Sequence, residues 1–332
     1  MILIGDVRER LKELPDESVN CCVTSPPYWG LRDYGNDGQI GLEQTPADFI
    51  AELVAVFREV KRVLRDDGTL WLNLGDSYAN SGTGKSSTKR GFNERYFGKE
   101  FAHDKQGADE GHVDRSGLLF DVKTKDLVGI PWRVAFALQA DGWYLRQDII
   151  WHKPNPMPES VRDRCTKAHE YIFLLSKSPK YYFDNQAIQE DAKTAPGATW
   201  KERKAAGATA GNVIVGDGVR NGTQRVVHGK GVTSNLTRQD GKRNKRSVWT
   251  VTTRPFQGAH FATFPPALIE PCILAGSPRG GVVLDPFFGA GTTGLVAQRH
   301  GREWIGCELN PEYAAIAKTR IEAEANLFTE TA

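Results

Sequence analysis

A run of small, rigid and aromatic residues follows an apolar stretch near the N-terminus: Ser25, Pro26, Pro27, Tyr28 and Trp29. The two prolines fix the backbone and lack N–H donors, so nearby carbonyl oxygens stay available as acceptors. Together with the Ser25 hydroxyl, these oxygens can accept hydrogen bonds from a planar group that carries an NH₂. The Tyr28 ring adds a stacking face, worth about 1–3 kcal/mol per nucleic-acid base. The plain structural alternative is a proline-rich turn with a packed Tyr-Trp pair.

A second candidate lies near the C-terminus, where an apolar run ends at Asp285 and is followed by Gly289 and Gly291. A turn of this kind before a helix presents free backbone N–H groups, which attract a carboxylate or a phosphate. The acid at the strand end would repel a pyrophosphate but suits the ammonium of an amino-acid ligand. Glu308 ends the next apolar run, about 20 residues on, where an acid can accept both ribose hydroxyls. S-adenosylmethionine (AdoMet) carries an ammonium, a carboxylate and a ribose, so this segment predicts an AdoMet site. A plain strand-to-helix turn is the alternative.

The two segments together predict methyl transfer to an amino nitrogen. This chemistry needs no covalent enzyme nucleophile, because aligning the nitrogen with the sulfonium methyl can supply up to about 7–11 kcal/mol by proximity. Stacking on Tyr28 would help offset the few kcal/mol needed to pull a base from a duplex.

Both segments resemble motifs of a known family, the DNA N4-cytosine and N6-adenine methyltransferases. Residues 285–293 look like the family's cofactor motif, and residues 25–28 look like its catalytic motif. The catalytic segment comes first, which resembles the permuted β class. The resemblance covers most of the chain outside residues 77–125 and 185–245. It implies an α/β, Rossmann-like AdoMet-dependent methyltransferase fold, circularly permuted, with a mostly parallel seven-stranded sheet, helices on both faces and a smaller target-recognition region.

The resemblance also implies roles for individual residues. The implied catalytic residues are Ser25, Pro26, Pro27 and Tyr28. The implied cofactor-binding residues are Asp6 (facing the cofactor adenine), Phe264 (in an element that closes over the methionine tail), Asp285, Phe287, Gly289, Gly291, Thr292, Thr293 and Glu308. The implied target-base pocket contains Trp29, Trp151, His152, Lys153 and Asn155, and the segment His169, Glu170, Tyr171 resembles part of the same pocket. We expect no metal site.

A basic region separates the two motifs. Residues 199–254 carry twelve Lys/Arg against three acids. Each phosphate that such cations neutralise releases counterions, and Arg, Lys, Asn and Gln can read base edges. We therefore expect a target-recognition region at 185–250 that contacts double-stranded DNA, with a solvated linker as the alternative. The expected DNA-binding residues are Arg220, Arg225, Arg238, Lys242, Arg243, Lys245 and Arg246.

Short apolar runs that alternate with amphipathic stretches predict the strands and helices that position these residues. This pattern favours a mostly parallel sheet covered on both faces, with ligands at the carboxyl ends of the strands. We expect strands at 1–5, 19–24, 69–74, 145–151, 171–176, 281–284 and 304–307, and helices at 47–64, 126–140 and 292–300. We expect residues 1–184 to form the catalytic half of the core, interrupted by a long insert at 77–125, and residues 251–332 to form the AdoMet-binding half.

Composition narrows the class of protein. A chain of 332 residues is about twice the ~150-residue prior for one domain, and 39% hydrophobic residues suit a globular fold. The formal charge of +2 does not by itself indicate nucleic acid. The five cysteines form no C-x-x-C pair, so we expect reduced, buried thiols. Without a signal-peptide pattern or an apolar run of ~18 residues, we expect a cytoplasmic protein with no membrane partner. The family resemblance implies that it is prokaryotic or phage-encoded.

Several alternatives stay open. In the family, a serine before Pro-Pro-Tyr resembles the N4-cytosine enzymes, so N4 of cytosine is favoured and N6 of adenine is the alternative. A C5-cytosine enzyme would need a cysteine thiolate after a proline. Pro271 and Cys272 offer that pair, but within a helical pattern, so we expect Cys272 in the core. A DNA-binding protein with an inactive methyltransferase core is an alternative from a different class. A homodimer and a cognate restriction endonuclease also stay open as partners.

Overall fold

The computed structural model describes residues 1–31, 35–36, 38–79, 122–123, 125–192, 241–253 and 263–329, with side chains through residue 324. By its internal contacts the chain divides into two units. The first comprises Met1–Tyr182 with Val248–Ala332, and the second is Phe183–Ser247. The first unit carries the large sheet and both candidate motifs, so it is the part that positions the site.

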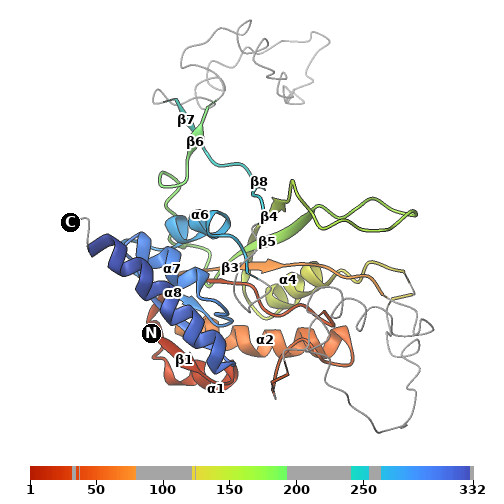
Figure 1. Ribbon diagram of the computed structural model, residues 1–332, viewed down its shortest axis with the longest axis horizontal. Helices are drawn as coiled ribbons and strands as arrows, with labels where there is room; N and C mark the ends of the chain where they lie inside the picture. Colours follow the sequence, from red (N-terminus) through yellow and green to blue (C-terminus); the bar gives the residue numbers. More distant parts are fainter. Residues whose placement is uncertain are drawn as a thin grey trace, which may run out of the picture. The chain divides into compact units, whose positions relative to one another are not determined.

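The large sheet has eight strands in the described residues, in the order β1-β10-β9-β2-β3-β5-β4-β8. Their bounds are β1 Ile2–Ile4, β2 Val19–Thr24, β3 Leu64–Leu74, β4 Tyr144–His152, β5 His169–Ser176, β8 Val248–Thr250, β9 Val282–Asp285 and β10 Glu303–Glu308. Figure 1 labels β1, β3, β4, β5 and β8 of this sheet. Every neighbouring pair is parallel except the two that β5 makes with β3 and β4. The predicted mostly parallel α/β sheet is confirmed. It has one strand more than the expected seven, because the short β8 pairs with the edge strand β4.

Helices cover both faces of this sheet. They are α1 Val7–Arg10, the 3₁₀ helix η1 Leu11–Glu13, α2 Pro46–Val63, α4 Ile130–Ala140, α6 Pro266–Gly276, α7 Thr292–Arg299 and α8 Pro311–Thr329. The alternation along β3 shows the two faces, as the twofold period of a strand requires. Leu72 and Leu74 belong to a core shared with α2 and α4. Thr69 and Trp71 lie against α6, where a Cβ on Gly276 would come 2.8 Å from Thr69 Oγ1.

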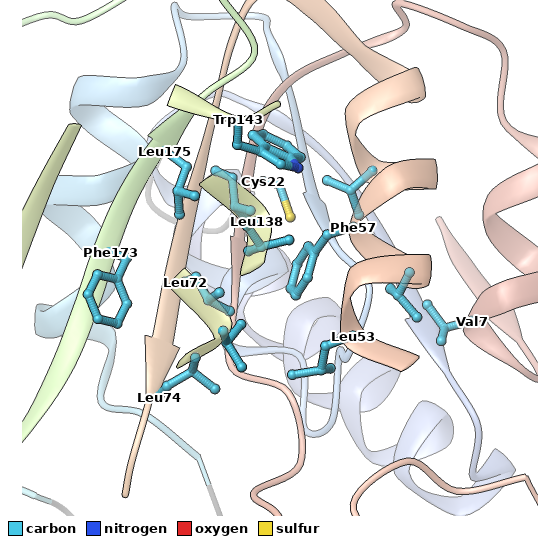
Figure 2. Close-up of a cluster of buried hydrophobic side chains, with 14 of the residues drawn as sticks. Val7, Cys22, Leu53, Phe57, Leu72, Leu74, Leu138, Trp143, Phe173 and Leu175 are labelled. Carbon is cyan, nitrogen blue, oxygen red and sulfur yellow. The ribbon is translucent and has the colours of Figure 1, made fainter. Parts of the chain in front are cut away.

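Figure 2 shows the first of these cores, where side chains from β3, α2 and α4 converge. Leu53 and Phe57 of α2, Leu72 of β3 and Leu138 of α4 are each fully buried. Removing such a side chain from water contributes about 1.5–3 kcal/mol. The helix α2 begins at Pro46 because the Thr45 hydroxyl accepts a hydrogen bond from the Asp48 N–H at 3.1 Å.

The helix α4 begins at Ile130 rather than at the predicted residue 126. The Asp76 carboxylate, just after β3, accepts hydrogen bonds from the N–H groups of Gly129 (2.9 Å) and Ile130 (3.0 Å). Gly129 has a φ of 77°, a left-handed conformation that favours glycine. The Asp76 side chain, which is distant in sequence, therefore sets the start of this helix. The periodicity of hydrophobic residues within the helix cannot predict that start.

The ends of the predicted insert at 77–125 lie side by side. Tyr78 and Leu127 form an antiparallel bridge, and the Ala79 N–H donates to the Asp126 carbonyl oxygen at 2.9 Å. The rest of that prediction falls on residues 80–121, which lie outside the described residues. The insert thus leaves and re-enters the core at one place, directly after β3.

Four of the five cysteines are buried, as predicted: Cys21, Cys22, Cys272 and Cys307. The prediction is wrong for Cys165, which is exposed. It lies in the connection between β4 and β5. Burial raises the pKa of the Cys21 thiol to about 12, so this group stays a neutral, unreactive core residue.

Candidate active site

A cavity of about 600 Å³ lies at the edge of the sheet where the parallel strands end. Ligand pockets of this size are typical for cofactors and substrates. Residues from seven strand ends line it, and in sheet order these are Asp6 after β1, Glu308 of β10, Asp285 of β9, Ser25 after β2, Asn73 of β3, Glu170 of β5 and Lys153 after β4. The predicted catalytic segment lies at the middle of this series, between a group of carboxylates and a polar cluster.

Asp285 is the most buried acid of the cavity, with 2% of its surface exposed. Its Oδ1 accepts hydrogen bonds from the Thr24 hydroxyl (2.6 Å) and the Phe287 N–H (3.0 Å), and its Oδ2 accepts from the Thr293 hydroxyl (2.6 Å). Burial nevertheless raises the pKa of Asp285 to about 6. A carboxylate has about four acceptor positions, so one stays available toward the cavity.

Glu308 lies beside Asp285 at the end of the neighbouring strand. Its carboxylate accepts from the Gly289 N–H at 2.7 Å and from the Asn310 N–H at 2.9 Å. Burial raises the pKa of Glu308 above its usual value. The hydrogen bond from the Gly289 N–H links the predicted Gly-rich turn to the end of β10. The positions of the turn and of the Glu308 carboxylate therefore depend on each other.

Asp6 completes the acidic end of the cavity. Its carboxylate caps α1 by accepting from the Arg8 N–H at 2.9 Å and also pairs with the Arg8 guanidinium. The guanidinium holds the pKa of Asp6 below its usual range. Asp6 therefore stays ionised to a lower pH than an ordinary aspartate, whereas burial shifts the pKa of Asp285 and Glu308 the opposite way.

The predicted cofactor residues separate into two groups. Seven line the cavity: Asp6, Phe264, Asp285, Phe287, Gly289, Thr292 and Glu308. Gly291 and Thr293 do not. Gly291 has a φ of 75°, and a Cβ there would lie 2.8 Å from the Ala317 Cβ, so helix packing against α8 requires this glycine. Thr293 acts through its hydrogen bond to Asp285.

This end of the cavity fits AdoMet. The cofactor carries a sulfonium and an ammonium cation, and three carboxylates line the wall. Burial raises the pKa of both Asp285 and Glu308, and a cation bound beside them would favour their ionised forms. The start of α7 at Thr292 supplies backbone N–H groups for a carboxylate, whereas the Gly289 N–H already donates to Glu308.

The other end of the cavity contains a polar cluster built around Glu170. The Tyr28 hydroxyl donates to Glu170 Oε2 at 2.8 Å, and the Lys153 ammonium pairs with Glu170 Oε1. Asn73 Nδ2 donates to the Tyr171 carbonyl oxygen at 3.0 Å and reaches Glu170 Oε2 at 3.3 Å. Lys153 and Glu170 are both largely buried, with 18% and 15% of their side chains exposed. The cluster fixes Tyr28 in one orientation at the cavity wall.

Close packing also fixes the Tyr28 ring. A Cβ on Gly75 would lie 2.4 Å from Tyr28 Cε2, so the ring fits against bare backbone. Trp151 forms a further wall, with the Lys153 ammonium 4.2 Å from its ring centroid. The Trp151 indole donates to the Val251 carbonyl oxygen at 2.8 Å.

The predicted catalytic residues Ser25, Pro26, Pro27 and Tyr28 all line the cavity, as do Trp151, Lys153 and Asn155 of the predicted base pocket. Two members of that pocket lie elsewhere. The Trp29 indole donates to the Glu43 carbonyl oxygen at 2.9 Å and packs on the core. His152 points to Thr250 of β8 at 3.2 Å. Adjacent residues of a strand face opposite ways, which separates His152 from Trp151 and Lys153.

Sequence reasoning gave no role to Asn73 and no individual role to Glu170. A signal for Asn73 was available, since it is a single polar residue within the apolar run Leu70–Leu74 and is 4% exposed. Glu170 belongs to a segment that the family resemblance had placed near the base, but its partners Tyr28 and Lys153 are far away in sequence.

The predicted DNA-binding residues belong to the second unit, and four of them are described. There β6 (Glu190–Asp191) and β7 (Lys242–Arg243) form a two-stranded antiparallel sheet. Lys242 pairs with Asp191 at 2.5 Å, and Glu190 pairs with Arg243 (2.9 Å) and Arg246 (2.7 Å). A phosphate would compete with these acids. Lys245 is also described in this unit, whereas Arg220, Arg225 and Arg238 lie outside the described residues.

Three other features bear on the class of chemistry. Cys272 is 1% exposed within α6, and its thiol lies 3.8 Å from the Leu268 carbonyl oxygen, so it is a core residue as predicted. Among the described residues no group of three or more His, Cys, Asp or Glu side chains could hold a metal ion. In the same part of the chain, no helix combines the length and apolar character that a membrane span requires.

Comparison with known proteins identifies the class. Residues 19–319 match the DNA methylase family N6_N4_Mtase. The chain is 47% identical over 320 residues to the Type II methyltransferase M.Cfr9I of Citrobacter freundii, covering 96% of this chain and 87% of that protein. Among solved structures, PvuII DNA methyltransferase (cytosine-N4-specific) has a TM-score of 0.58 at 20% identity, covering 96% and 85% of the two chains. The Thermus thermophilus protein TTHA0409, a putative DNA modification methylase solved with S-adenosyl-L-methionine, has a TM-score of 0.54 at 25% identity, covering 97% and 93%.

The chain therefore belongs to the DNA methylase family. It is a DNA methyltransferase that uses AdoMet and methylates an exocyclic amino group of a base. The identity to M.Cfr9I extends over nearly the whole chain, so the family assignment covers both ends of the cavity and not one motif alone.

Proposed function

We propose that the methylated atom is N4 of cytosine. The observation that carries this proposal is the Lys153 ammonium, which Glu170 and Trp151 hold in the wall of the base end of the cavity. On its Watson–Crick edge, beside the amino group, cytosine presents two acceptors, N3 and O2, whereas the same edge of adenine presents one acceptor, N1, followed by an apolar C2–H. A cationic donor complements the cytosine edge better. Ser25 before Pro-Pro-Tyr, the arrangement that resembles the N4-cytosine enzymes, supports the same base.

In this proposal Ser25 and the backbone carbonyl oxygen at Pro26 accept hydrogen bonds from the amino group. Tyr28 stacks on the flipped base, and the Glu170 cluster holds the tyrosine in place. AdoMet, when bound, supplies the electrophilic methyl group. The chain contributes alignment, since β2 and β9 are neighbours and their following loops bring the amino group and the methyl donor to one point.

The cofactor end would work by charge and by hydrogen bonds. We assign the ammonium of AdoMet to Asp285, the ribose hydroxyls to Glu308 and the adenine to Asp6. The start of α7 at Thr292 would bind the carboxylate, and Phe264 and Phe287 would enclose the apolar part of the methionine tail. These residues line one continuous cavity, which supports their acting together.

We further propose that residues 185–250 form the target-recognition region and that its cations contact DNA phosphates. The Type II name of M.Cfr9I supports a role in a restriction–modification pair in a bacterial cytoplasm, with a cognate endonuclease that cuts the unmethylated site. Co-expression tests the pairing, because an endonuclease encoded beside this chain should be tolerated by a host only while the methyltransferase is active.

Mass spectrometry of nucleosides tests the proposed base. Plasmid DNA methylated by the purified protein and digested to nucleosides should contain N4-methylcytosine. N6-methyladenine in its place would overturn the cytosine proposal and leave the amino-methyltransferase class intact. Single-molecule sequencing of DNA from an expressing host then gives the sequence around the modified base.

Two variants test the base end of the cavity. Lys153→Met keeps the length of the side chain but removes its donors, so kcat/KM should fall about 10- to 100-fold, the effect of losing a charged hydrogen bond. Tyr28→Ala should abolish most activity. Both should bind AdoMet like the unmodified protein in calorimetry, because neither residue lies at the acidic end. A large loss of AdoMet affinity in Tyr28→Ala would place Tyr28 in the wrong part of the cavity.

A further inference from the structure

Two large apolar side chains at the cavity are exposed to solvent. Met157, in the connection between β4 and β5, is 62% exposed, and Leu31, after the catalytic segment, is 60% exposed. Both line the cavity that contains Tyr28. Other exposed apolar residues of the described chain, such as Phe136 on α4, do not line it. Because both side chains line the cavity, a ligand that enters it from solvent would bury apolar surface on them.

The backbone around Met157 is unusually constrained for a surface connection. Prolines stand on both sides of it, at 156 and 158, and each fixes one φ angle. Two residues before Met157, Asn155 is anchored to Thr253 through Nδ2 to the carbonyl oxygen (3.1 Å) and from the Thr253 N–H to Oδ1 (3.0 Å). A backbone that is already held in place loses little further backbone entropy when its side chain is buried by a partner.

The charge of the same connection favours a polyanion as that partner. Between β4 and β5, Lys153 is already paired with Glu170 in the cavity wall. The rest of this connection has three cations, Arg162, Arg164 and Lys167, and two acids, Glu159 and Asp163. Arg164 pairs with Glu159 at 2.7 Å, and Asp163 pairs with Lys125 at 2.9 Å. Arg162 is exposed beside them. An exposed apolar side chain, Met157, on a positively charged connection suits a DNA duplex with an unstacked base step. The cations can contact its phosphates, and the apolar side chain can contact its bases.

We propose that Met157 enters the DNA duplex at the position that the flipped base leaves and stacks against its orphaned partner. Apolar wedges of this kind, methionine among them, insert between bases when proteins open a duplex. Burying the exposed side chain would offset part of the unstacking and unpairing that flipping requires. Met157 is chosen over Leu31 because the two prolines and the Asn155 anchor hold its backbone in place. This inference rests on the proposed function only in that the duplex must contain a target base.

Isotope labelling gives a direct test, because Met1 and Met157 are the only methionines of the chain. The full-length protein with ¹³C-methyl methionine should show two methyl resonances, assigned by the Met157→Leu variant. On addition of a duplex that contains the methylated site found by sequencing, the Met157 resonance should move upfield through the ring currents of the bases. The Met1 resonance should stay in place. A Met157 resonance that also stays in place would overturn the proposal.

Kinetics test the role in flipping. Met157→Ala should lower kcat/KM on the paired duplex by about tenfold or more, the effect of losing a buried methionine side chain. On a duplex with an abasic site opposite the target, the loss should be less than about threefold, because the base is already unpaired. Met157→Leu should keep an apolar wedge and most of the activity. Phe136→Ala is the matched control, an exposed apolar residue away from the cavity, and should behave like the unmodified protein.

Equal losses for Met157→Ala on the paired and the abasic duplex would overturn the wedge, since a merely structural role weakens both reactions alike. Unchanged activity on the paired duplex would overturn it too. Failure of the proposed function looks different. If mass spectrometry finds N6-methyladenine, the cytosine assignment fails, and the Met157 experiments run unchanged on the adenine site.

Discussion

The ionisation of Asp285 controls AdoMet binding in the proposed site, and this gives a prediction with a defined pH range. Asp285 is buried beside the cavity, and its pKa is raised from 3.8 to about 6 by that burial. Only the ionised form attracts the ammonium of AdoMet. At pH 7 about nine tenths of the carboxyl groups are ionised, and at pH 5 about one tenth. The affinity for AdoMet should therefore fall about tenfold between pH 7 and pH 5.

The same shift has a consequence for stability without ligand. A raised pKa means that the folded state binds the proton more tightly than the unfolded state does. The stabilisation is present below the unfolded pKa and is lost as the pH rises from about 4 through about 6. A shift of about two units corresponds to about 3 kcal/mol. AdoMet should offset this loss, so its effect on Tm should be larger at pH 7 than at pH 5.

Isothermal titration calorimetry from pH 5 to pH 7 measures the prediction. Near pH 6, binding should release about half a proton from Asp285, which appears as a dependence of the binding heat on the buffer's ionisation enthalpy. Asp285→Asn keeps the shape of the side chain and the acceptor for Thr24 but removes the charge. It should bind AdoMet weakly, and its affinity should lose the dependence on pH. Glu308, whose pKa is also raised, can add to the slope, so Glu308→Gln is the control.

The reasoning would be refuted by an Asp285→Asn variant that folds and keeps the pH profile of the unmodified protein. It would also be refuted by buffer-independent binding heats of the unmodified protein at pH 6. Either result would mean that Asp285 only supports the loop through Thr24, Thr293 and the Phe287 N–H.

Three further predictions concern single side chains. Glu170→Gln removes the charged partner of Lys153 and weakens the hydrogen bond that holds Tyr28. We expect kcat to fall about tenfold or more while the Kd for AdoMet stays constant. An equal change in kcat and Kd would contradict a role confined to the base end of the cavity. Gly75→Ala places a Cβ 2.4 Å from the present position of Tyr28 Cε2. This variant should lose about 1–3 kcal/mol of folding free energy and should methylate DNA poorly. Normal methylation kinetics would show that the position of the Tyr28 ring is unimportant. Cys272→Ala should methylate DNA normally, and its free energy of unfolding, measured with denaturant, should be about 1 kcal/mol lower. A folded Cys272→Ala variant that binds AdoMet but is inactive would point to C5-cytosine chemistry.

Residue types within a few positions of one another predicted several elements correctly. The strand at 19–24 has the predicted bounds, because an apolar run that ends at two prolines has few other conformations. The Gly-rich turn before α7 was equally clear, since glycines at positive φ mark such turns. Gly291 shows the limit of this reasoning. The residue type was informative, but its reason is the closeness of Ala317 in α8, which local sequence does not contain.

The sequence by itself determined the two chemical loops, because their residue types act through backbone geometry within a few positions. It did not determine which loops meet. Only the tertiary structure pairs β2 with β9, so that the Thr24 hydroxyl reaches Asp285 across 261 positions of sequence at 2.6 Å. The antiparallel β5 likewise begins at the same edge where its neighbours end, which brings Glu170 to Tyr28 and Lys153. Strand order depends on how much apolar surface the whole chain buries on both faces of the sheet. No single segment of the sequence can determine it.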